Sequence, residues 1–225
     1  MTTIAVMQPY FFPYAGYYRL PAAADVFVIF DCVQFPRRGW VHRNKLPRHD
    51  GELDWLTLPL KKPGYHDKIS DLAFPDDAYE AFVARCRAFP LLGQLDQGSH
   101  DDPLIQAFFN FDGTVVDYLD RTLKEITRRL GFDPVFRRSS AMAIPPEIRG
   151  QDRVLAIVEA CGGSRYINLS GGREYYDPAR FFAKSIELNI FRPYEGSYDS
   201  VLTRVLAGEI DDIRREIRAN LSFLD

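Results

Sequence analysis

The chain has 225 residues, a formal net charge of -3 and an aromatic share of 14%. This length supports one large domain with a sizeable core, and the near-neutral charge argues against the basic surface of a nucleic-acid-binding protein. No apolar run reaches the roughly 20 residues that cross a bilayer, and the amino terminus lacks a signal-peptide pattern. We therefore expect a cytoplasmic protein with neither a membrane nor a nucleic acid as its partner.

Metal and disulfide chemistry find little support in the sequence. The cysteines Cys32, Cys86 and Cys161 are odd in number and unclustered, which argues against a disulfide framework or a zinc finger. The His-Asp pairs along the chain lack the spacing that places two metal ligands on one face. We predict no metal site, and the sequence identifies neither a cofactor nor an oligomeric state.

The first predicted element is a short apolar strand from Thr3 to Met7, buried on both faces. Pro9 ends it, because proline has no donor for a sheet ladder and biases Gln8 towards extended geometry. A turn rich in prolines and rings follows, and a short helix is expected over residues 15–24, where Gly16 admits a close backbone approach. In open α/β sheets, ligands bind at this carboxyl edge of the strands.

A second apolar strand is predicted over residues 26–30, and another over residues 53–60. From residue 76 the apolar residues recur at helical spacing, most clearly over residues 114–130, where Gly131 stands at the position of a carboxyl cap. We therefore predict a helical insertion over about residues 76–130.

Strands and helices alternate in the rest of the chain. Strands are predicted over residues 134–138, 165–169 and 188–191, a helix over residues 151–161, and a helical tail over residues 200–221. This order predicts a single α/β domain over residues 1–225, with a mainly parallel sheet and flanking helices.

Four polar clusters follow predicted strands, and we expect them to meet in one crevice at the carboxyl edge of the sheet. The clusters are Gln8 with Tyr10, Asp31 with Cys32 and Gln34, the run His42-Arg43-Asn44-Lys45, and Ser170-Gly171-Gly172-Arg173.

Each candidate catalytic residue also has a structural interpretation. Asp31 either caps the next turn or acts as an acid, base or ligand. Cys32 is either an inert small residue or a nucleophile. His42 has polar neighbours and is as well suited to catalysis as to a structural role.

The candidate binding residues surround these groups. Arg43 and Lys45, with Asn44 between them, suit an anionic ligand group or form a solvated face. Ser170 and Gly171 begin a turn that either offers backbone donors to a phosphate or is only a loop. The aromatic residues between Tyr10 and Tyr18 predict a pocket wall. In this pocket Gln8 and Tyr10 would orient the substrate, and Tyr14 and Tyr17 would contact it.

Several of these stretches resemble the WbqC-like protein family, which is found among genes for O-antigen, other surface glycans and natural products. The similar stretches are MQPYFFPYAGYYRL, DCVQF, GWVHRNKL, GQDRVLAIVEACGG and YINLSGGREYYDP. The resemblance covers nearly the whole chain and implies modification of a sugar or small metabolite. The family pattern often has Asp where Cys32 stands. This difference argues against a mechanism that depends on Cys32 and favours functional roles for Asp31, His42, Arg43 and Asn44.

A second resemblance concerns the fold. Tyr14-Ala15-Gly16-Tyr17, after a strand and a proline, looks like the HxGH segment of nucleotidyltransferases of the pantothenate synthetase type. This likeness implies a nucleotidyltransferase-like, Rossmann-like architecture. Both histidines of that signature are tyrosines here, and a neutral phenol cannot present the cation that those enzymes use on the triphosphate.

These observations favour a group-transfer enzyme that moves an acyl or aminoacyl group from a small-molecule donor to an amino sugar or similar acceptor. Asp31 or His42 would take a proton from the acceptor, or Cys32 would attack a thioester with His42 as its base. A nucleotide-dependent transferase or ligase, and a non-catalytic binding protein of a glycan-assembly complex, are the alternatives.

Overall fold

The computed structural model describes residues 1–93, 95 and 101–224, and a five-stranded sheet of parallel strands lies at its centre. The strand order is β5-β2-β1-β6-β7, so the first strand of the chain lies in the middle. The strands of this sheet are β1 (Thr3–Met7), β2 (Val26–Ile29), β5 (Val135–Arg138), β6 (Arg165–Asn168) and β7 (Glu187–Ile190). This arrangement confirms the predicted α/β, Rossmann-like architecture.

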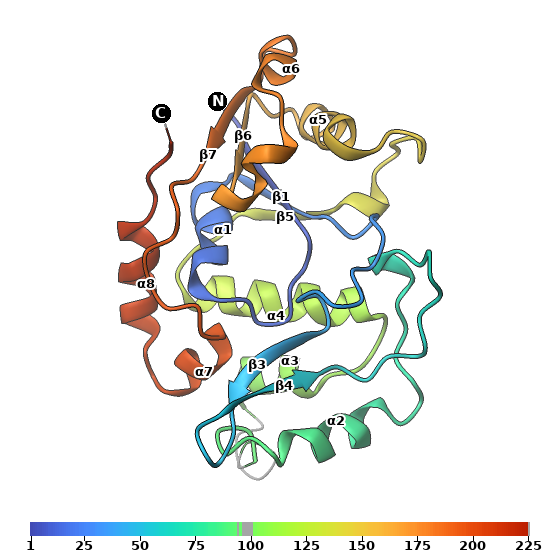
Figure 1. Cartoon of the computed structure of the whole chain (residues 1–225), viewed down its shortest axis with the longest axis vertical. Helices are drawn as coiled ribbons and strands as arrows, with labels where there is room; N and C mark the ends of the chain where they lie inside the picture. Colours follow the sequence, from blue (N-terminus) through green and yellow to red (C-terminus); the bar gives the residue numbers. More distant parts are fainter. Residues whose placement is uncertain (94, 96–100, 225) are drawn as a thin grey trace.

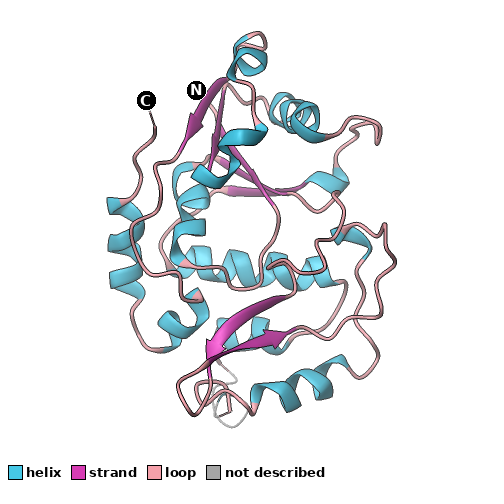
Figure 2. Ribbon diagram, viewed as in Figure 1, coloured by secondary structure: helices cyan, strands magenta, loops and turns pink. Residues whose placement is uncertain are grey.

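Helices cover both faces of this sheet (Figures 1 and 2). The α-helices are α1 (Arg19–Ala23), α2 (Ala78–Cys86), α3 (Pro103–Phe109), α4 (Val115–Arg129), α5 (Gly150–Ala160), α6 (Pro178–Phe182), α7 (Val201–Leu206) and α8 (Ile210–Ala219). The 3-10 helices are η1 (Ala15–Tyr18), η2 (Ile69–Asp71), η4 (Ser139–Ala141) and η5 (Ser170–Tyr175). Among the described residues, none of the helices has the length and apolar content that a membrane span requires.

The alternation of side chains along β1 divides the core into two clusters. Ile4 and Val6 pack on one face with residues of α5 and α6. Ala5 points to the other face, where a larger cluster joins α1, α4, α7 and α8. The first strand is therefore buried on both faces, as its apolar sequence predicts.

The segment between β2 and β5 contains a separate two-stranded antiparallel sheet (Figure 2). Its strands are β3 (Arg43–Pro47) and β4 (Leu53–Thr57). The prediction that the polar run from His42 to Lys45 follows a strand is wrong, because Arg43 to Lys45 begin β3 itself. Alternation along this strand buries Asn44 and leaves Lys45 exposed.

The helical tail predicted over residues 200–221 is divided into α7 and α8. Gly208 lies between them with a φ of 84°, in the left-handed region that glycine adopts most readily. Such a residue ends a helix, so the chain turns and begins α8 in a new direction.

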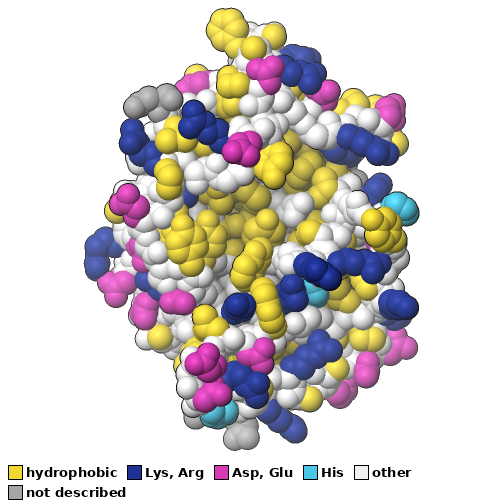
Figure 3. All heavy atoms as spheres, in the orientation of Figure 1, with side chains coloured by type: hydrophobic (Ala, Val, Ile, Leu, Met, Phe, Trp, Pro, Cys, Tyr) yellow, Lys and Arg dark blue, Asp and Glu magenta, His cyan; other side chains and the backbone are white. Residues whose placement is uncertain are grey.

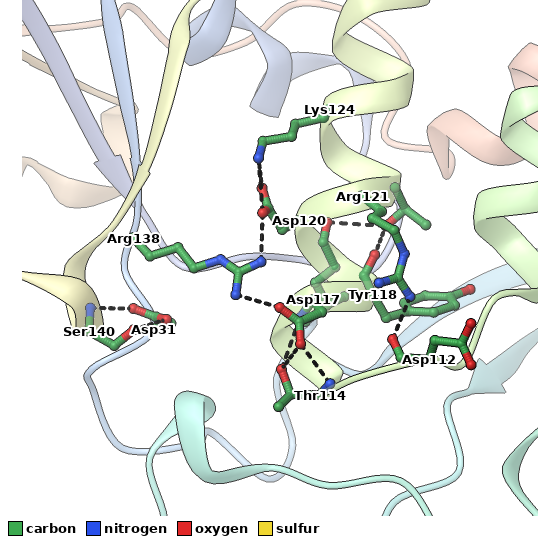
Figure 4. A network of polar contacts seen from close by, with 12 residues as sticks. Asp31, Asp112, Thr114, Asp117, Tyr118, Asp120, Arg121, Lys124, Arg138 and Ser140 are labelled. Carbon is green, nitrogen blue, oxygen red and sulfur yellow. Dashed lines mark hydrogen bonds and ion pairs between the residues drawn. The ribbon is translucent and has the colours of Figure 1, made fainter.

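A polar network joins the carboxyl end of β5 to α4 (Figure 4). The Thr114 hydroxyl accepts from the Asp117 N–H, and the Asp117 carboxylate accepts from the Thr114 N–H, which makes a capping box. Arg138 donates to Asp117 and Asp120, each at 2.6 Å. The Thr114 N–H and the Arg138 guanidinium hold the pKa of Asp117 at about 2. This pairing fixes the edge strand to the longest helix.

Candidate functional site

A cavity of about 700 Å³ opens at the carboxyl ends of β1 and β6. The neighbour of β1 is β2 on one side and β6 on the other, so this is the switch point at which open α/β sheets bind ligands. Figure 3 shows hydrophobic side chains gathered in a hollow near the centre of the molecular face that it draws. The lining residues are Val6, Met7, Gln8, Tyr10, Tyr14, Tyr17, Phe30, Gly150, Gln151, Val154, Asn168, Leu169, Ser170, Gly171, Gly172, Tyr175 and Tyr176.

The described lining of this cavity contains no Asp, Glu, Lys, Arg or His. Burial raises the pKa of Tyr10, Tyr14 and Tyr176 above the ordinary value, and raises that of Tyr17 further. These phenols are neutral at physiological pH and both donate and accept hydrogen bonds. The cavity therefore suits an uncharged ligand group that has apolar faces and several hydroxyl or amide groups.

The loop after β1 carries much of the cavity wall and contains a strained residue. Phe12 has a φ of 45°, which is rare for a bulky side chain. Its carbonyl accepts from the Asn44 amide at 2.6 Å and from the Ser200 hydroxyl at 2.9 Å. Asn44 also donates to the Phe11 carbonyl at 3.1 Å. Strain of this kind persists only where the surroundings hold it, and here Asn44 of β3 and Ser200, directly before α7, do so.

Gln8 stands at the tip of β1 and offers its side chain to the cavity. The Tyr17 hydroxyl donates to the main-chain oxygen of Gln8 at 2.8 Å, which fixes the backbone at this position. No hydrogen bond joins the Gln8 side chain to another residue in the described part of the chain. Its amide is therefore available to a ligand as both donor and acceptor.

Tyr14 is held in the wall by two other rings. Its ring lies 4.9 Å from that of Tyr198 and 5.3 Å from that of Tyr194, measured between centroids. Gly16 faces the same rings, and a Cβ placed on it would lie 2.7 Å from Tyr194 Cγ and closer still to Tyr14. The close backbone approach predicted for Gly16 is therefore confirmed.

The opposite wall is organised by Asn168 at the end of β6. Its amide donates to the Tyr166 and Tyr176 hydroxyls, both at 3.0 Å, and its oxygen accepts from the Leu169 N–H at 2.7 Å. Gln151 on α5 exchanges two hydrogen bonds with the main chain of Asp177. These contacts position η5 and its glycine turn beside the cavity.

The structure brings together six of the predicted site residues and leaves six elsewhere. The six that line the cavity are Gln8, Tyr10, Tyr14, Tyr17, Ser170 and Gly171. The six outside its described lining are Asp31, Cys32, His42, Arg43, Asn44 and Lys45. Sequence analysis missed Gln151, Asn168, Tyr175 and Tyr176, although Asn168 ends a predicted strand directly before the glycine turn. Two of the four predicted polar clusters therefore meet in this cavity.

Asp31 is buried and joins the ends of two strands. Its carboxylate accepts from the Ser139 hydroxyl at 2.9 Å and from the N–H and hydroxyl of Ser140 at 2.8 and 2.5 Å (Figure 4). The Ser139 oxygen in turn accepts from the N–H groups of Asp31 and Cys32. Next to it, the Cys32 sulfur accepts from Nε of Arg153 at 2.9 Å. These contacts tie β2 to η4 and α5, and the catalytic roles of Asp31 and Cys32 stay predictions.

His42 precedes β3 and packs with its ring against that of Phe35, at a centroid distance of 5.0 Å. Burial, together with the positive charges of Arg43 and Arg85, lowers its pKa from 6.5 to about 4. The imidazole is therefore neutral near pH 7, and its catalytic role also stays a prediction.

We expect the contribution of His42 to stability to be fully present above pH 6.5 and to disappear as the pH falls towards 4. The reason is that the unfolded imidazole takes up a proton over this interval and the folded one does not. The measurement is the melting temperature of the wild type and of His42→Gln across this interval, with His49→Gln as the control for an exposed imidazole. A gap between wild type and His42→Gln that is independent of pH would contradict this assignment.

Comparison with known proteins places these features in a family. The model of the WbqC-like protein family matches residues 8–203. The chain is 25% identical over 201 residues to the uncharacterized protein Rv1507c of Mycobacterium tuberculosis (strain ATCC 25618 / H37Rv), a match that covers 88% of this chain and 85% of that protein. No solved structure is significantly similar to the chain, so the likeness to nucleotidyltransferases stays a prediction. The chain belongs to the WbqC-like protein family.

Proposed function

We propose that this protein is a group-transfer enzyme that acts on an amino sugar or a similar small metabolite in surface-glycan or natural-product biosynthesis. The observation that carries the proposal is the neutral, tyrosine-walled cavity at the switch point of the sheet. A sugar ring has apolar faces that pack on aromatic rings and hydroxyls that pair with amides and phenols. The resemblance to a family found among glycan and natural-product genes supports this substrate class.

Acyl or aminoacyl transfer fits this environment. The neutral amine of the acceptor attacks the acyl carbonyl, a C–N bond forms, the donor's leaving group departs, and the amine proton passes to that group or to water. Because the described lining has no ionised side chain, we assign catalysis to the positioning of the two reactants and to hydrogen-bond donors near the developing oxyanion. The Gln8 amide and the Tyr10 hydroxyl are the candidate donors, and Tyr14 and Tyr17 form the wall.

Gly171→Val tests the cavity without disturbing the fold. A Cβ on Gly171 meets no atom within 4 Å, and Gly171 lines the cavity, so we expect the melting temperature to stay within about 2 °C of the wild type. The added methyl groups occupy ligand space, and overpacking at about 1–3 kcal/mol corresponds to binding that is roughly 5- to 150-fold weaker. The measurement is calorimetry or ligand-observed NMR with a panel of amino hexoses, with turnover of acyl thioester and aminoacyl donors followed by mass spectrometry.

Phe182→Ala on α6 is the matched control, because this side chain is 85% exposed and is not among the cavity residues. It should bind the panel as the wild type does. Equal binding and turnover by Gly171→Val, Gln8→Ala and the wild type would exclude the cavity as the acceptor site.

A further inference from the structure

The hairpin of β3 and β4 carries a cluster that combines indole rings and cations. Trp40 and Trp55 lie with their ring centroids 5.1 Å apart. The Arg43 guanidinium carbon is 4.1 Å from the centroid of the Trp55 ring, and Lys45 Nζ is 5.4 Å from it. We call these four residues the indole platform.

Strand register explains why these side chains share a face. Lys45 is paired directly with Trp55 across the hairpin, and Arg43 is two residues before Lys45 on the same strand. Trp40 is 44% exposed, so one large aromatic surface is open to a ligand. The chain has two tryptophans, and both are in this platform.

The cations of the platform are available to an anion. The Arg43 guanidinium donates to the main-chain oxygens of Gly39 and Arg38, at 3.3 and 2.9 Å. Neither Arg43 nor Lys45 forms an ion pair with a carboxylate in the part of the chain that the structure describes. Arg37 and Arg38 are exposed in the preceding turn and add positive charge. Figure 3 shows Lys and Arg side chains gathered below the hydrophobic hollow, over β3 and β4.

The platform is fixed directly to the cavity wall. The Phe11 N–H donates to the Trp40 carbonyl at 2.9 Å, and the preceding residue, Tyr10, lines the cavity. Asn44, which lies between Arg43 and Lys45, binds the carbonyls of Phe11 and Phe12. The loop after β1 therefore connects the platform to the cavity wall.

From these contacts we propose that the indole platform binds the nucleotide portion of a nucleoside-diphosphate-linked sugar, whose sugar enters the cavity. The proposal deepens the proposed function and rests on it for the sugar. A base has a π face that stacks on the open Trp40 ring, and the phosphates pair with Arg43 and Lys45. The uncharged cavity and the cationic platform thus match the two chemically different halves of such a molecule.

Tryptophan fluorescence tests the platform, because the two tryptophans of the chain, Trp40 and Trp55, both belong to the platform. Uridine diphosphate and adenosine diphosphate are titrated into the protein with excitation at the red edge, where tyrosine does not absorb. We expect saturable quenching by both nucleotides, and affinity about tenfold lower in Trp40→Ala, where Trp55 still reports. Lys45→Ala should weaken binding and reduce its dependence on salt, and Phe182→Ala should change neither.

Three results would overturn the proposal. The first is no saturable quenching by either nucleotide. The second is pyrophosphate that binds as tightly as the nucleotides, with Trp40→Ala at wild-type affinity, since only charge would then be recognised. The third is a short single-stranded RNA that binds far more tightly than any mononucleotide, which would indicate a nucleic-acid surface instead.

The cavity and the platform can fail separately in this experiment. Gly171→Val should leave quenching by uridine diphosphate unchanged, because that ligand lacks the diphosphate-linked sugar that would enter the cavity. Quenching with no binding of amino sugars by the wild type would contradict the proposed function alone. Sugar binding without quenching would contradict the platform alone.

Discussion

Asp31→Ala is expected to destabilise the protein by about 3 kcal/mol, since hydrogen bonds to a buried carboxylate contribute about 1.5–3 kcal/mol and the donors left behind lose their partner. The carboxylate is 1% exposed and accepts from Ser139 and Ser140, which brings η4 to the end of β2. For a chain of this length the loss corresponds to a fall of roughly 10 °C in the melting temperature. Differential scanning calorimetry measures it directly.

Asp133→Asn is the matched control, because Asp133 is an exposed aspartate two residues before β5, the strand that η4 follows. It should leave the melting temperature unchanged. A catalytic role for Asp31 predicts a different result in the melting temperature and in turnover. If Asp31→Ala keeps its melting temperature and loses turnover, the carboxylate acts on the substrate and not on the fold.

Much of the sheet could be predicted because its strands are recognisable from the local sequence. Thr3 to Met7 and Val26 to Ile29 are short apolar runs. In the last third of the chain, strands alternate with helices, which is the order typical of an α/β fold. Their polar tips, Gln8 and Ser170, line the cavity as the position after a parallel strand implies. The local pattern was sufficient here because each residue acts where its own strand ends.

The rest of the site depends on contacts that no local pattern contains. Asn44 looks like part of a polar run, yet in the structure it is buried and binds the carbonyls of Phe11 and Phe12, more than thirty residues earlier. Asp31 follows β2 and Asn168 ends β6, and both of these strands neighbour β1, yet only Asn168 lines the cavity. The Asp31 carboxylate instead accepts from Ser139 and Ser140, more than one hundred residues later, so the local sequence could not distinguish the two.

The loop after β1 therefore links the two halves of the proposed site. Its strained residue, Phe12, is held from one side by Asn44 and from the other by Ser200. Tyr10 and Tyr14 of the same loop line the cavity, and Phe11 donates to the main-chain oxygen of Trp40 in the platform. A substitution that moves this loop should affect ligand binding and stability together, whereas a substitution at the open edge of the cavity should affect binding alone.

Gly16→Ala is the sharpest test of that coupling. The new Cβ would lie 2.7 Å from Tyr194 Cγ and closer still to the Tyr14 ring, both within a packed aromatic cluster. Overpacking of this kind costs about 1–3 kcal/mol, and relief requires both rings to move, which takes Tyr14 away from the cavity wall. We expect a lower melting temperature together with loss of amino-sugar binding.

The matched control is the same substitution at Gly171, where a Cβ meets open space, so Gly171→Ala should leave stability unchanged. In Gly16→Ala with Tyr14→Ala, one of the two rings that obstruct the methyl group is absent, and stability should partly return relative to the sum of the single variants. Strictly additive losses in this double-mutant cycle would mean that Tyr14 and Gly16 act independently. Tyr14 would then owe its position to Tyr194 and Tyr198 alone, and the loop after β1 would not transmit packing changes to the cavity.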